Sequence, residues 1–535
     1  MKKIEELDLG FNDAENFRKR ENRVLFNRLF TRTEDLDSLL DRTKYFLIGD
    51  KGTGKTALSI FLSNNDYKNT AGETKFIRET EYLKFVSLKK KNQLTLSEYA
   101  DIWKVILYLL VSKQLAEKER DNVLFSRFSK FKPLKQAIEE FYSKAFSPEI
   151  IYAINFVEDS KRAAEILNEY FKLSDEDSNS ISFSESRFQI NLLYIQKKFE
   201  EGIQSLNLEK DHIIFIDGID IRPRNVDYEE YLECIKGLTN AVWNLNTGFF
   251  ANIKGSKGRI KIVLLIRPDI FAKIGLQNLN NKIKDNSVLL DWRTTYPVYR
   301  NSRIFKLIDN ILSSQQNKKI GLGEAWDYYF PYQPFVYKKK EDSFISFLRF
   351  SMFKPRDIVS MLSILQDNFK NEVGRKYPVF NESDFDNPTF FRSYSDYLLG
   401  EVKDYLAFYH TEQDYELFLK FFEFLEGKVR FEYEYYMDAY DKFADYIENN
   451  GIDAPVFFET SDAFLQFLFE LNIICYVEHT EDLEPHIHWC FRERTYSNLN
   501  PKVKLGVEYS IHYGLAKAFN VGKRFRRRKI KKKQI

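Results

Sequence analysis

The sequence is poor in cysteine and contains no long apolar segment, and both absences exclude broad classes of protein. Its only cysteines, Cys234, Cys475 and Cys490, are too few for a disulfide framework and suit a reducing cytosol. The densest apolar run, residues 106–111, is far shorter than the ~18–20 residues that cross a bilayer. The first residues, MKKIEELDLGFND, turn acidic where a signal peptide would be apolar. We therefore expect a cytoplasmic protein with no membrane segment.

Net charge is also nearly absent, at +2, but the charges are segregated along the 535 residues. Residues 405–500 contain 20 Asp and Glu against six Lys and Arg, whereas 523–533, KRFRRRKIKKK, contain nine basic residues and no acid. A basic segment this dense can neutralise several phosphates, which would give sequence-independent and salt-sensitive binding of nucleic acid. It can equally dock on the acidic region before it, or remain solvated.

One strong motif stands out, within the stretch KYFLIGDKGTGKTALSIFL at 44–62. Residues 49–56 match G-x-x-x-x-G-K-[ST] at every fixed position, between an apolar run typical of a buried strand and a pattern typical of a helix. Glycines let backbone N–H groups curl around a polyphosphate, towards which the helix points its positive end. We predict that Lys55 contacts the β- and γ-phosphates of ATP and that Thr56 ligates Mg²⁺. The other predicted nucleotide-binding residues of this loop are Gly49, Asp50, Lys51, Gly52, Thr53 and Gly54.

A P-loop requires an acid at the end of a nearby strand, and the stretch HIIFIDGID supplies two. The apolar run 213–216 ends in Asp217, and Asp220 follows in the same turn. We predict that Asp217 orders the Mg²⁺ hydration shell and that Asp220 orients or deprotonates the attacking water. The alternative for Asp217 is an ordinary turn cap after a strand.

Two arginines are candidates for contact with the phosphates. In RIKIVLLIRPDIF, the buried-strand run 260–266 ends at Arg267, which would point into the crevice at the carboxyl edge of a parallel sheet. Arg356, in KPRD at the start of an amphipathic helix, would contact the phosphates when a lid closes. The alternative for Arg267 is a solvated arginine at the start of a loop. The alternative for Arg356 is helix capping or a local pair with Asp357. Further candidates, for arginine fingers acting on a neighbouring subunit, are Arg293, Arg300 and Arg303, with surface salt bridges as the alternative.

These motifs together resemble the STAND branch of the AAA+-related P-loop ATPases, and a group of bacterial P-loop ATPases with DGID-R-P and LIRPD motifs. The resemblance covers roughly residues 20–370, and Gly218 is typical of STAND proteins, where most AAA+ motors have glutamate. It departs at Ile221 and Arg222, where STAND proteins usually have a glutamate after the second Asp. The resemblance implies a nucleotide-driven switch or an oligomeric assembly, often in bacterial defence against phage.

The helical and strand patterns outside the motifs predict the domain organisation. Helical spacing in LSEYADIWKVILYLL and RFQINLLYIQKKFEEGI predicts a helical insertion, after a strand at 84–88 and with a polar break at 174–180. We expect an α/β P-loop NTPase with a parallel sheet core, a helical lid and a C-terminal winged-helix-like module. The predicted boundaries are 1–22 lead-in, 23–301 core with the insertion at 94–206, 302–400 lid, 405–520 acidic winged-helix-like module and 521–535 basic tail.

The C-terminal module is predicted from helices followed by a hairpin of strands at 473–477 and 486–491, with Ser461 as the cap of the last helix. The non-core positions of that helix are Asp462, Gln466 and Glu470, unlike a helix that reads a DNA groove. We therefore expect it to contact a protein. The sequence HIHWC would place His486, His488 and Cys490 on one strand face, but the spacing favours a half-buried strand over a zinc site.

The sequence thus predicts an ATP-binding, ATP-hydrolysing switch or assembly platform. Its partners would be further copies of the chain, a protein that supplies an effector, or nucleic acid at the basic tail 523–533. The alternatives are a DNA-associated ATPase motor and a scaffold that binds nucleotide without hydrolysing it.

Overall fold

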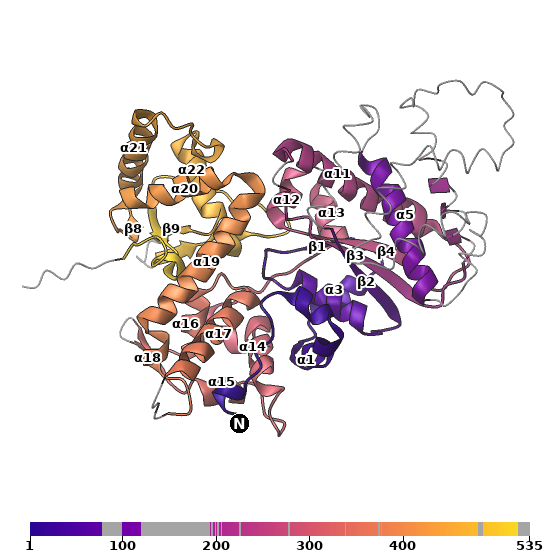
Figure 1. Ribbon diagram of the computed structural model, residues 1–535, viewed down its shortest axis with the longest axis horizontal. Coiled ribbons are helices and arrows are strands. Elements are labelled where there is room, and N and C mark those ends of the chain that lie inside the picture. The colour runs from indigo at the N-terminus through magenta and orange to yellow at the C-terminus, as the bar shows by residue number, and fades with distance from the viewer. Residues whose placement is uncertain are drawn as a thin grey trace, which may run out of the picture. The chain divides into compact units, whose positions relative to one another are not determined.

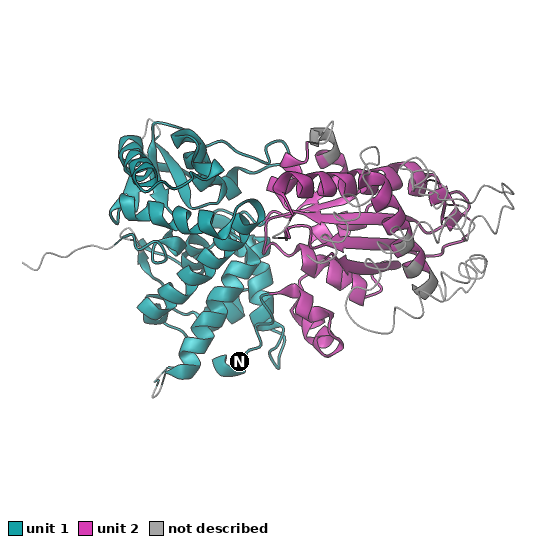
Figure 2. Cartoon of the chain, turned by 45° about the horizontal axis from the view of Figure 1, so that its top comes forward, with its two compact units in different colours: residues 1–12, 292–535 teal, residues 13–291 magenta. Residues whose placement is uncertain are grey.

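The protein is described from a computed structural model, in which the chain forms two compact units (Figure 2). One unit comprises residues 13–291, and the other comprises residues 1–12 with 292–535. The predicted strand at 84–88, the break at 174–180, most of the predicted insertion and the basic tail lie outside the described residues. The described residues are 1–77, 99–118, 206–223, 226–275, 279–336, 339–372, 375, 377–479 and 485–522, with single positions between 193 and 204.

A five-stranded, all-parallel sheet forms the centre of the unit 13–291 (Figure 1). Its strands are almost entirely buried, as in parallel sheets covered on both faces. Ile48 pairs in register with Ile266, and Ile216 pairs with Leu264, so the three central strands end at one level. The strands, in spatial order, are β2 (Thr70–Phe76), β3 (Asp211–Asp217), β4 (Ile260–Ile266), β1 (Phe46–Ile48) and β5 (Ser287–Leu289).

Helices cover both faces of this sheet (Figure 1). Alternate strand residues such as Leu47 and Phe215 pack in one core with the helices of the first face, and Phe46 packs on Phe271 of the second, with ring centroids 5.0 Å apart. The sheet is therefore an α/β core, as predicted. The first face carries α1 (Arg23–Leu29), α2 (Glu34–Leu40) and α3 (Lys55–Asn64), and the second carries α5 (Tyr99–Lys118), α11 (Tyr228–Asn244) and α12 (Pro268–Lys273).

Strand β2 was not predicted, because its sequence TAGETKF has no apolar run. Its polar residues Glu73 and Lys75 pair with each other, and Lys75 is buried. A Cβ atom at Gly72 would lie 2.5 Å from the carbonyl oxygen of Leu62 in α3. Tertiary packing therefore selects this strand, and glycine is needed where the helix crosses it.

The unit of residues 1–12 and 292–535 is mainly helical up to residue 409, followed by further helices and a four-stranded antiparallel sheet. Among the described residues of the whole chain, no helix combines the length and apolarity that a bilayer crossing requires. The α-helices of this unit up to residue 470 are α14 (Arg303–Ser313), α15 (Glu324–Tyr329), α16 (Ser343–Phe350), α17 (Pro355–Asn371), α18 (Glu382–Phe385), α19 (Pro388–Tyr409), α20 (Glu412–Phe421), α21 (Tyr433–Asn449) and α22 (Ser461–Glu470).

Two details of the predicted hairpin module are wrong. The cap of α22 is Thr460, whose side chain accepts a hydrogen bond from the Ala463 N–H at 3.2 Å, and Ser461 is already helical. The second hairpin strand ends at His488, because Cys490 begins a short helix, α23 (Cys490–Glu493). The sheet, in spatial order, is β10 (Pro485–His488), β9 (Ile474–His479), β11 (Glu508–Ile511) and β8 (Arg430–Phe431).

A fully buried histidine joins this sheet to the preceding helices. The Nδ1 atom of His512 accepts the N–H of Gly514 at 3.2 Å, and its Nε2 lies 3.3 Å from the carbonyl oxygen of Ser351. One ring nitrogen accepts and the other donates, so the imidazole is neutral. Burial lowers the pKa of His512 from 6.5 to about 4, and the positive charges of Arg492 and Lys354 act in the same direction.

Stability is expected to fall on acidification because His512 is protonated more readily in the unfolded chain. The stability that the neutral imidazole contributes is complete above pH 6.5 and is lost as the pH falls towards about 4. The shift in pKa corresponds to roughly 3 kcal/mol of unfolding free energy. His512→Gln should therefore be less stable than the wild type at pH 7 but lose less stability between pH 7 and pH 5, measured by urea unfolding. The exposed His486 provides a control, and an H512Q slope equal to that of the wild type would contradict the assignment.

Candidate nucleotide-binding site

The loop 49–56 joins the end of β1 to the start of α3 and has the backbone that a phosphate cradle requires. Gly52 and Gly54 have positive φ values of +85° and +95°, a conformation that glycine adopts without strain. Gly54 caps α3, and a Cβ built there would meet no atom within 4 Å. Thr53 closes the loop by donating its hydroxyl to the Asp50 carbonyl at 2.7 Å. The loop therefore leaves open space where helix N–H groups point outwards.

Lys55 is the only residue of this loop whose charge is buried, with 8% of its surface exposed. Its ammonium donates to the carbonyl oxygens of Gly49 at 2.7 Å and Asp50 at 3.2 Å. Burial lowers the pKa of Lys55, while the carboxylates of Asp220, Asp217 and Asp50 act in the opposite direction. The lysine is thus a desolvated cation held by neutral oxygens, which is a favourable arrangement for binding an anion.

Thr56 and Asp217 are in direct contact although 161 positions separate them, and this contact joins the loop to β3. The Thr56 hydroxyl donates to Asp217 Oδ2 at 2.6 Å, and Asp217 Oδ1 accepts the N–H of Gly218 at 2.8 Å. Burial raises the pKa of Asp217 to about 6, and the charge of Asp220 acts in the same direction. The Thr56 hydroxyl donates a hydrogen bond to the carboxylate, and the lone pairs of its oxygen remain available to bind a cation.

The turn after Asp217 is fixed at its first residue. Gly218 has a φ of +89°, and a Cβ there would lie 2.5 Å from the carbonyl oxygen of Ile77. The N–H of Ile77 in turn donates to the Asp217 carbonyl at 2.9 Å. Asp220 follows, half-buried, and its charge acts on both Asp217 and Lys55. The two predicted acids therefore lie beside the predicted lysine.

The turn that carries Asp220 is held by a residue that sequence reasoning missed. The hydroxyl of Tyr231, on α11, donates towards the carbonyl oxygens of Ile219 at 3.1 Å and Ile221 at 3.0 Å. A tyrosine one turn inside a helix matches no motif, so no sequence signal distinguishes it from a core residue.

Arg267 follows β4 at the same sheet edge and is 2% exposed, so the alternative of a solvated arginine is wrong. It forms a bidentate pair with Asp269, with Nε–Oδ1 at 3.0 Å and Nη2–Oδ2 at 2.5 Å. Its positive charge is one of those that lower the pKa of Lys55. Because the partner lies two positions along in the sequence RPD, its acid could have been identified from the sequence.

Arg356 belongs to the other unit, where it is the second residue of α17. It pairs with Glu401 of α19 at 3.5 Å, rather than with Asp357 as the alternative proposed. Asp357 instead accepts the N–H of Met352 at 2.8 Å and the hydroxyl of Tyr397 at 3.2 Å. Asp357 therefore holds the start of α17 in place, and Arg356 lies in the first turn of that helix.

The three arginines proposed as fingers are engaged within this same unit. Arg300 forms ion pairs with both Asp327 and Asp342 at 2.6 Å, as the salt-bridge alternative predicted. The other two have neighbours of different kinds: Arg303 lies 5.7 Å from the ring centroid of Trp292, and Arg293 donates to the Arg492 carbonyl at 2.6 Å.

The loop, Thr56 and Asp217 fit magnesium and a nucleoside polyphosphate. Hydroxyl and carboxylate oxygens are ligands that Mg²⁺ prefers, and positive-φ glycines beside a helix start are suited to phosphate. Strand order also favours this edge. The helix after β1 covers one face of the sheet and the helix after β4 covers the other. The loop therefore lies at the topological switch point of the sheet, where ligands bind in open α/β folds.

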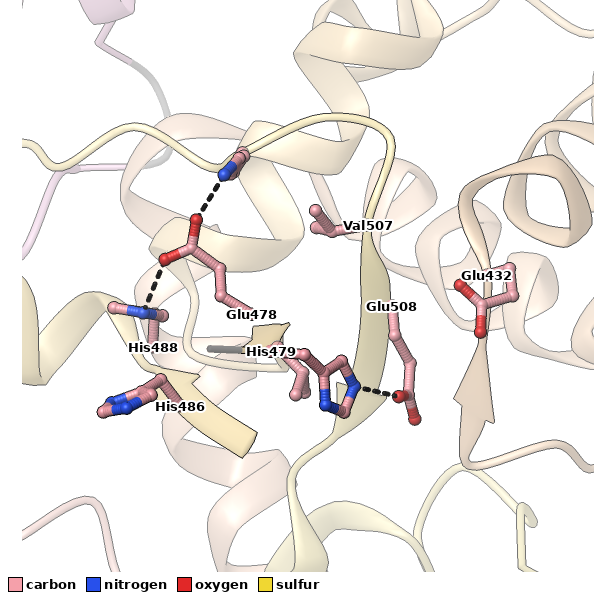
Figure 3. A pocket seen from close by; sticks show the side chains of 9 residues that line it. Glu432, Glu478, His479, His486, His488, Val507 and Glu508 are labelled. Atoms are coloured by element: carbon pink, nitrogen blue, oxygen red, sulfur yellow. Dashed lines mark hydrogen bonds and ion pairs between the residues drawn. The ribbon is translucent and has the colours of Figure 1, made fainter. Parts of the chain in front are cut away.

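A hollow of about 670 Å³ lies on the antiparallel sheet (Figure 3). His488 lies between Glu478 and Glu493, with a nitrogen–oxygen distance of 3.0 Å to each, and His479 is 3.8 Å from Glu508. The predicted shared face of His486, His488 and Cys490 is wrong, since Cys490 is buried and helical. No group of three or more His, Cys, Asp or Glu side chains that could hold a metal ion occurs in the described part of the chain.

No protein-family model matches this chain, and comparison with curated proteins gives no match.

Proposed function

We propose that the protein binds ATP with Mg²⁺ on residues 49–56 and hydrolyses it. The observation that carries the proposal is the 2.6 Å contact between Thr56 and Asp217. It unites a P-loop hydroxyl with the acid of another strand, as phosphoryl-transfer sites require. The desolvated Lys55 beside both residues supports the same conclusion.

Each residue has a distinct role in this proposal. Backbone N–H groups of the loop and Lys55 would hold the phosphates, and Thr56 and Asp217 would hold the cation with its water shell. The bound cation would neutralise charge on the β- and γ-phosphates. Asp220 would orient or deprotonate the attacking water. Arg267, kept in place by Asp269, would stabilise negative charge as it develops.

The second unit is proposed to respond to the nucleotide. Its helices α14–α19 would form a lid, and Arg356 at the entry of α17 would couple lid position to the phosphates. Helices α20–α22 and the β9–β10 hairpin have the elements of a winged helix. By resemblance, we propose a switch or assembly platform that acts through further copies of the chain or an effector protein, with bacterial anti-phage defence as its setting.

The polar side chains of α22 support a protein-contact role rather than DNA reading. Gln466 donates to Glu470 at 2.7 Å and to the Pro501 carbonyl at 3.0 Å, and Asp462 accepts the Tyr433 hydroxyl at 3.0 Å. These groups are used within the unit, in a region rich in acids that would repel phosphates. A helix that reads base edges presents such groups to the groove.

The proposal predicts that Mg²⁺ strengthens ATP binding through the hydroxyl of Thr56. We expect Thr56→Val to lose most of this strengthening, about tenfold or more, and to lower turnover, while ATP affinity in EDTA stays within about threefold of wild type. Calorimetry with and without Mg²⁺ measures the difference. Ser63→Ala, on the same helix with its hydroxyl bonded to Ser59 and Thr74, is the matched control. Equal Mg²⁺ dependence in T56V and wild type would contradict the site.

Turnover of the wild-type protein separates the alternatives. Turnover that rises with duplex DNA and falls steeply with salt would favour a DNA-associated motor. Bound nucleotide with negligible turnover would favour a scaffold. The pair of Arg267 with Asp269 provides a physical reason for that alternative, because it occupies the guanidinium that would otherwise stabilise charge on the phosphates. Turnover indifferent to DNA is the result expected here.

A further inference from the structure

The hydroxyl of Tyr231 contacts the backbone on both sides of Asp220. It lies 3.1 Å from the carbonyl oxygen of Ile219 and 3.0 Å from that of Ile221. A phenol has one hydrogen to donate, so the two carbonyls share it. The carbonyl groups of the residues before and after Asp220 are thereby held by a single side chain.

The tyrosine is itself held rigidly, because it is completely buried in the second turn of α11. The helix is capped by Asp227, which accepts the N–H of Glu229 at 3.0 Å. It also packs closely on α5, where a Cβ at Gly237 would lie 2.4 Å from the Cβ of Tyr99. A phenol on such a helix can set the position of the turn with little freedom.

The opposite end of the turn is equally constrained. Gly218 is fixed by its positive φ and by the approach of Ile77, and the Ile219 side chain is buried. Within 218–221, these contacts fix the backbone on either side of Asp220 and leave its side chain half-buried, with its charge acting on Lys55. The contacts at both ends of the turn therefore fix the backbone around Asp220.

We propose that Tyr231 is a positioning residue that holds Asp220 for ATP hydrolysis, an inference that rests on the proposed function. In this step a water oxygen forms a bond to the γ-phosphorus, and the bond from that phosphorus to the β–γ bridging oxygen breaks, giving ADP and phosphate. The Asp220 carboxylate accepts the proton of the water and later releases it to solvent. Tyr231 is completely buried, and it acts on Asp220 through the turn.

The first test separates catalysis from binding. Tyr231→Phe keeps the ring and removes the hydroxyl, and we expect kcat to fall about tenfold while Kd for ATP and the thermal midpoint change little. Tyr436→Phe removes a comparable buried hydroxyl, which donates to the Ser461 carbonyl at 2.6 Å in the other unit, and should leave kcat unchanged. Equal loss in the two variants would mean a general structural effect and would overturn the inference.

The second test is a double-mutant cycle. Asp220→Asn should lower kcat by about a hundredfold, and adding Tyr231→Phe to it should lower kcat less than about twofold further, because the two residues act as one unit. Multiplicative losses would overturn the inference alone. Absence of turnover in the wild-type protein would overturn hydrolysis and this inference together, whereas wild-type turnover unaffected by Y231F would overturn only the inference.

Discussion

Lys55→Ala is expected to weaken ATP binding at least a hundredfold and to abolish measurable turnover, while the nucleotide-free protein stays folded. Loss of a buried, hydrogen-bonded charge from a binding site costs about 2–5 kcal/mol, and each 1.4 kcal/mol corresponds to about a factor of ten in affinity. The Lys55 ammonium donates its protons to the carbonyl oxygens of Gly49 and Asp50, which are neutral groups, so binding gains the full attraction of the phosphates.

The stability of the protein should change little in this variant, which separates loss of binding from loss of folding. Burial lowers the pKa of Lys55, so its charge destabilises the empty folded site, whereas alanine leaves two loop carbonyls without this donor. These terms oppose each other, and the thermal midpoint should shift by less than about 3 °C. Lys236→Ala, which removes a half-exposed lysine paired with Glu233 on α11, controls for loss of charge. Undiminished ATP affinity in K55A would refute the nucleotide site.

The candidate site was predictable where the residues that form it are adjacent in the sequence. The loop 49–56 and the sequence after β3 each combine an apolar run with the residues that follow it, and parallel strands bring such ends to one edge. Thr56 and Asp217 were each predicted to hold Mg²⁺, and their closeness in the structure needs only that geometry. The charges of Asp220 and Arg267 also reach Lys55, in agreement with their assignment to the same site.

The remaining features depend on contacts that no local pattern encodes. Strand β2 carries the ion pair of Glu73 with the buried Lys75, so its polarity predicts a loop, and its packing against α3 and β3 overrides that preference. Tyr231 resembles any core tyrosine until the turn 219–221 is brought against it. Thr460 and Ser461 are both good caps, and the extended backbone of Thr460, with φ −138° and ψ 155°, decides between them.

Gly218→Ala is expected to be the most damaging single-methyl change near the site. An alanine must adopt the φ of +89° and place its Cβ 2.5 Å from the carbonyl oxygen of Ile77, which is backbone and cannot rotate away. We expect a loss of about 2–4 kcal/mol in unfolding free energy, measured by urea unfolding. Turnover should fall more than about tenfold, because displacement of the turn moves Asp217 and Asp220 together.

Two further variants identify the cause of that loss. Asn adopts positive φ more readily than alanine, so Gly218→Asn relieves the backbone strain but keeps the clash with Ile77, and it should remain close to G218A if the contact dominates. Gly248→Ala, at an exposed helical position where a Cβ meets nothing within 4 Å, should be neutral or slightly stabilising. Wild-type stability in G218A would show that the approach of residue 77 is not part of the native turn. By the same argument, the glutamate that most AAA+ motors carry at this position cannot enter the turn without displacing the backbone of residue 77.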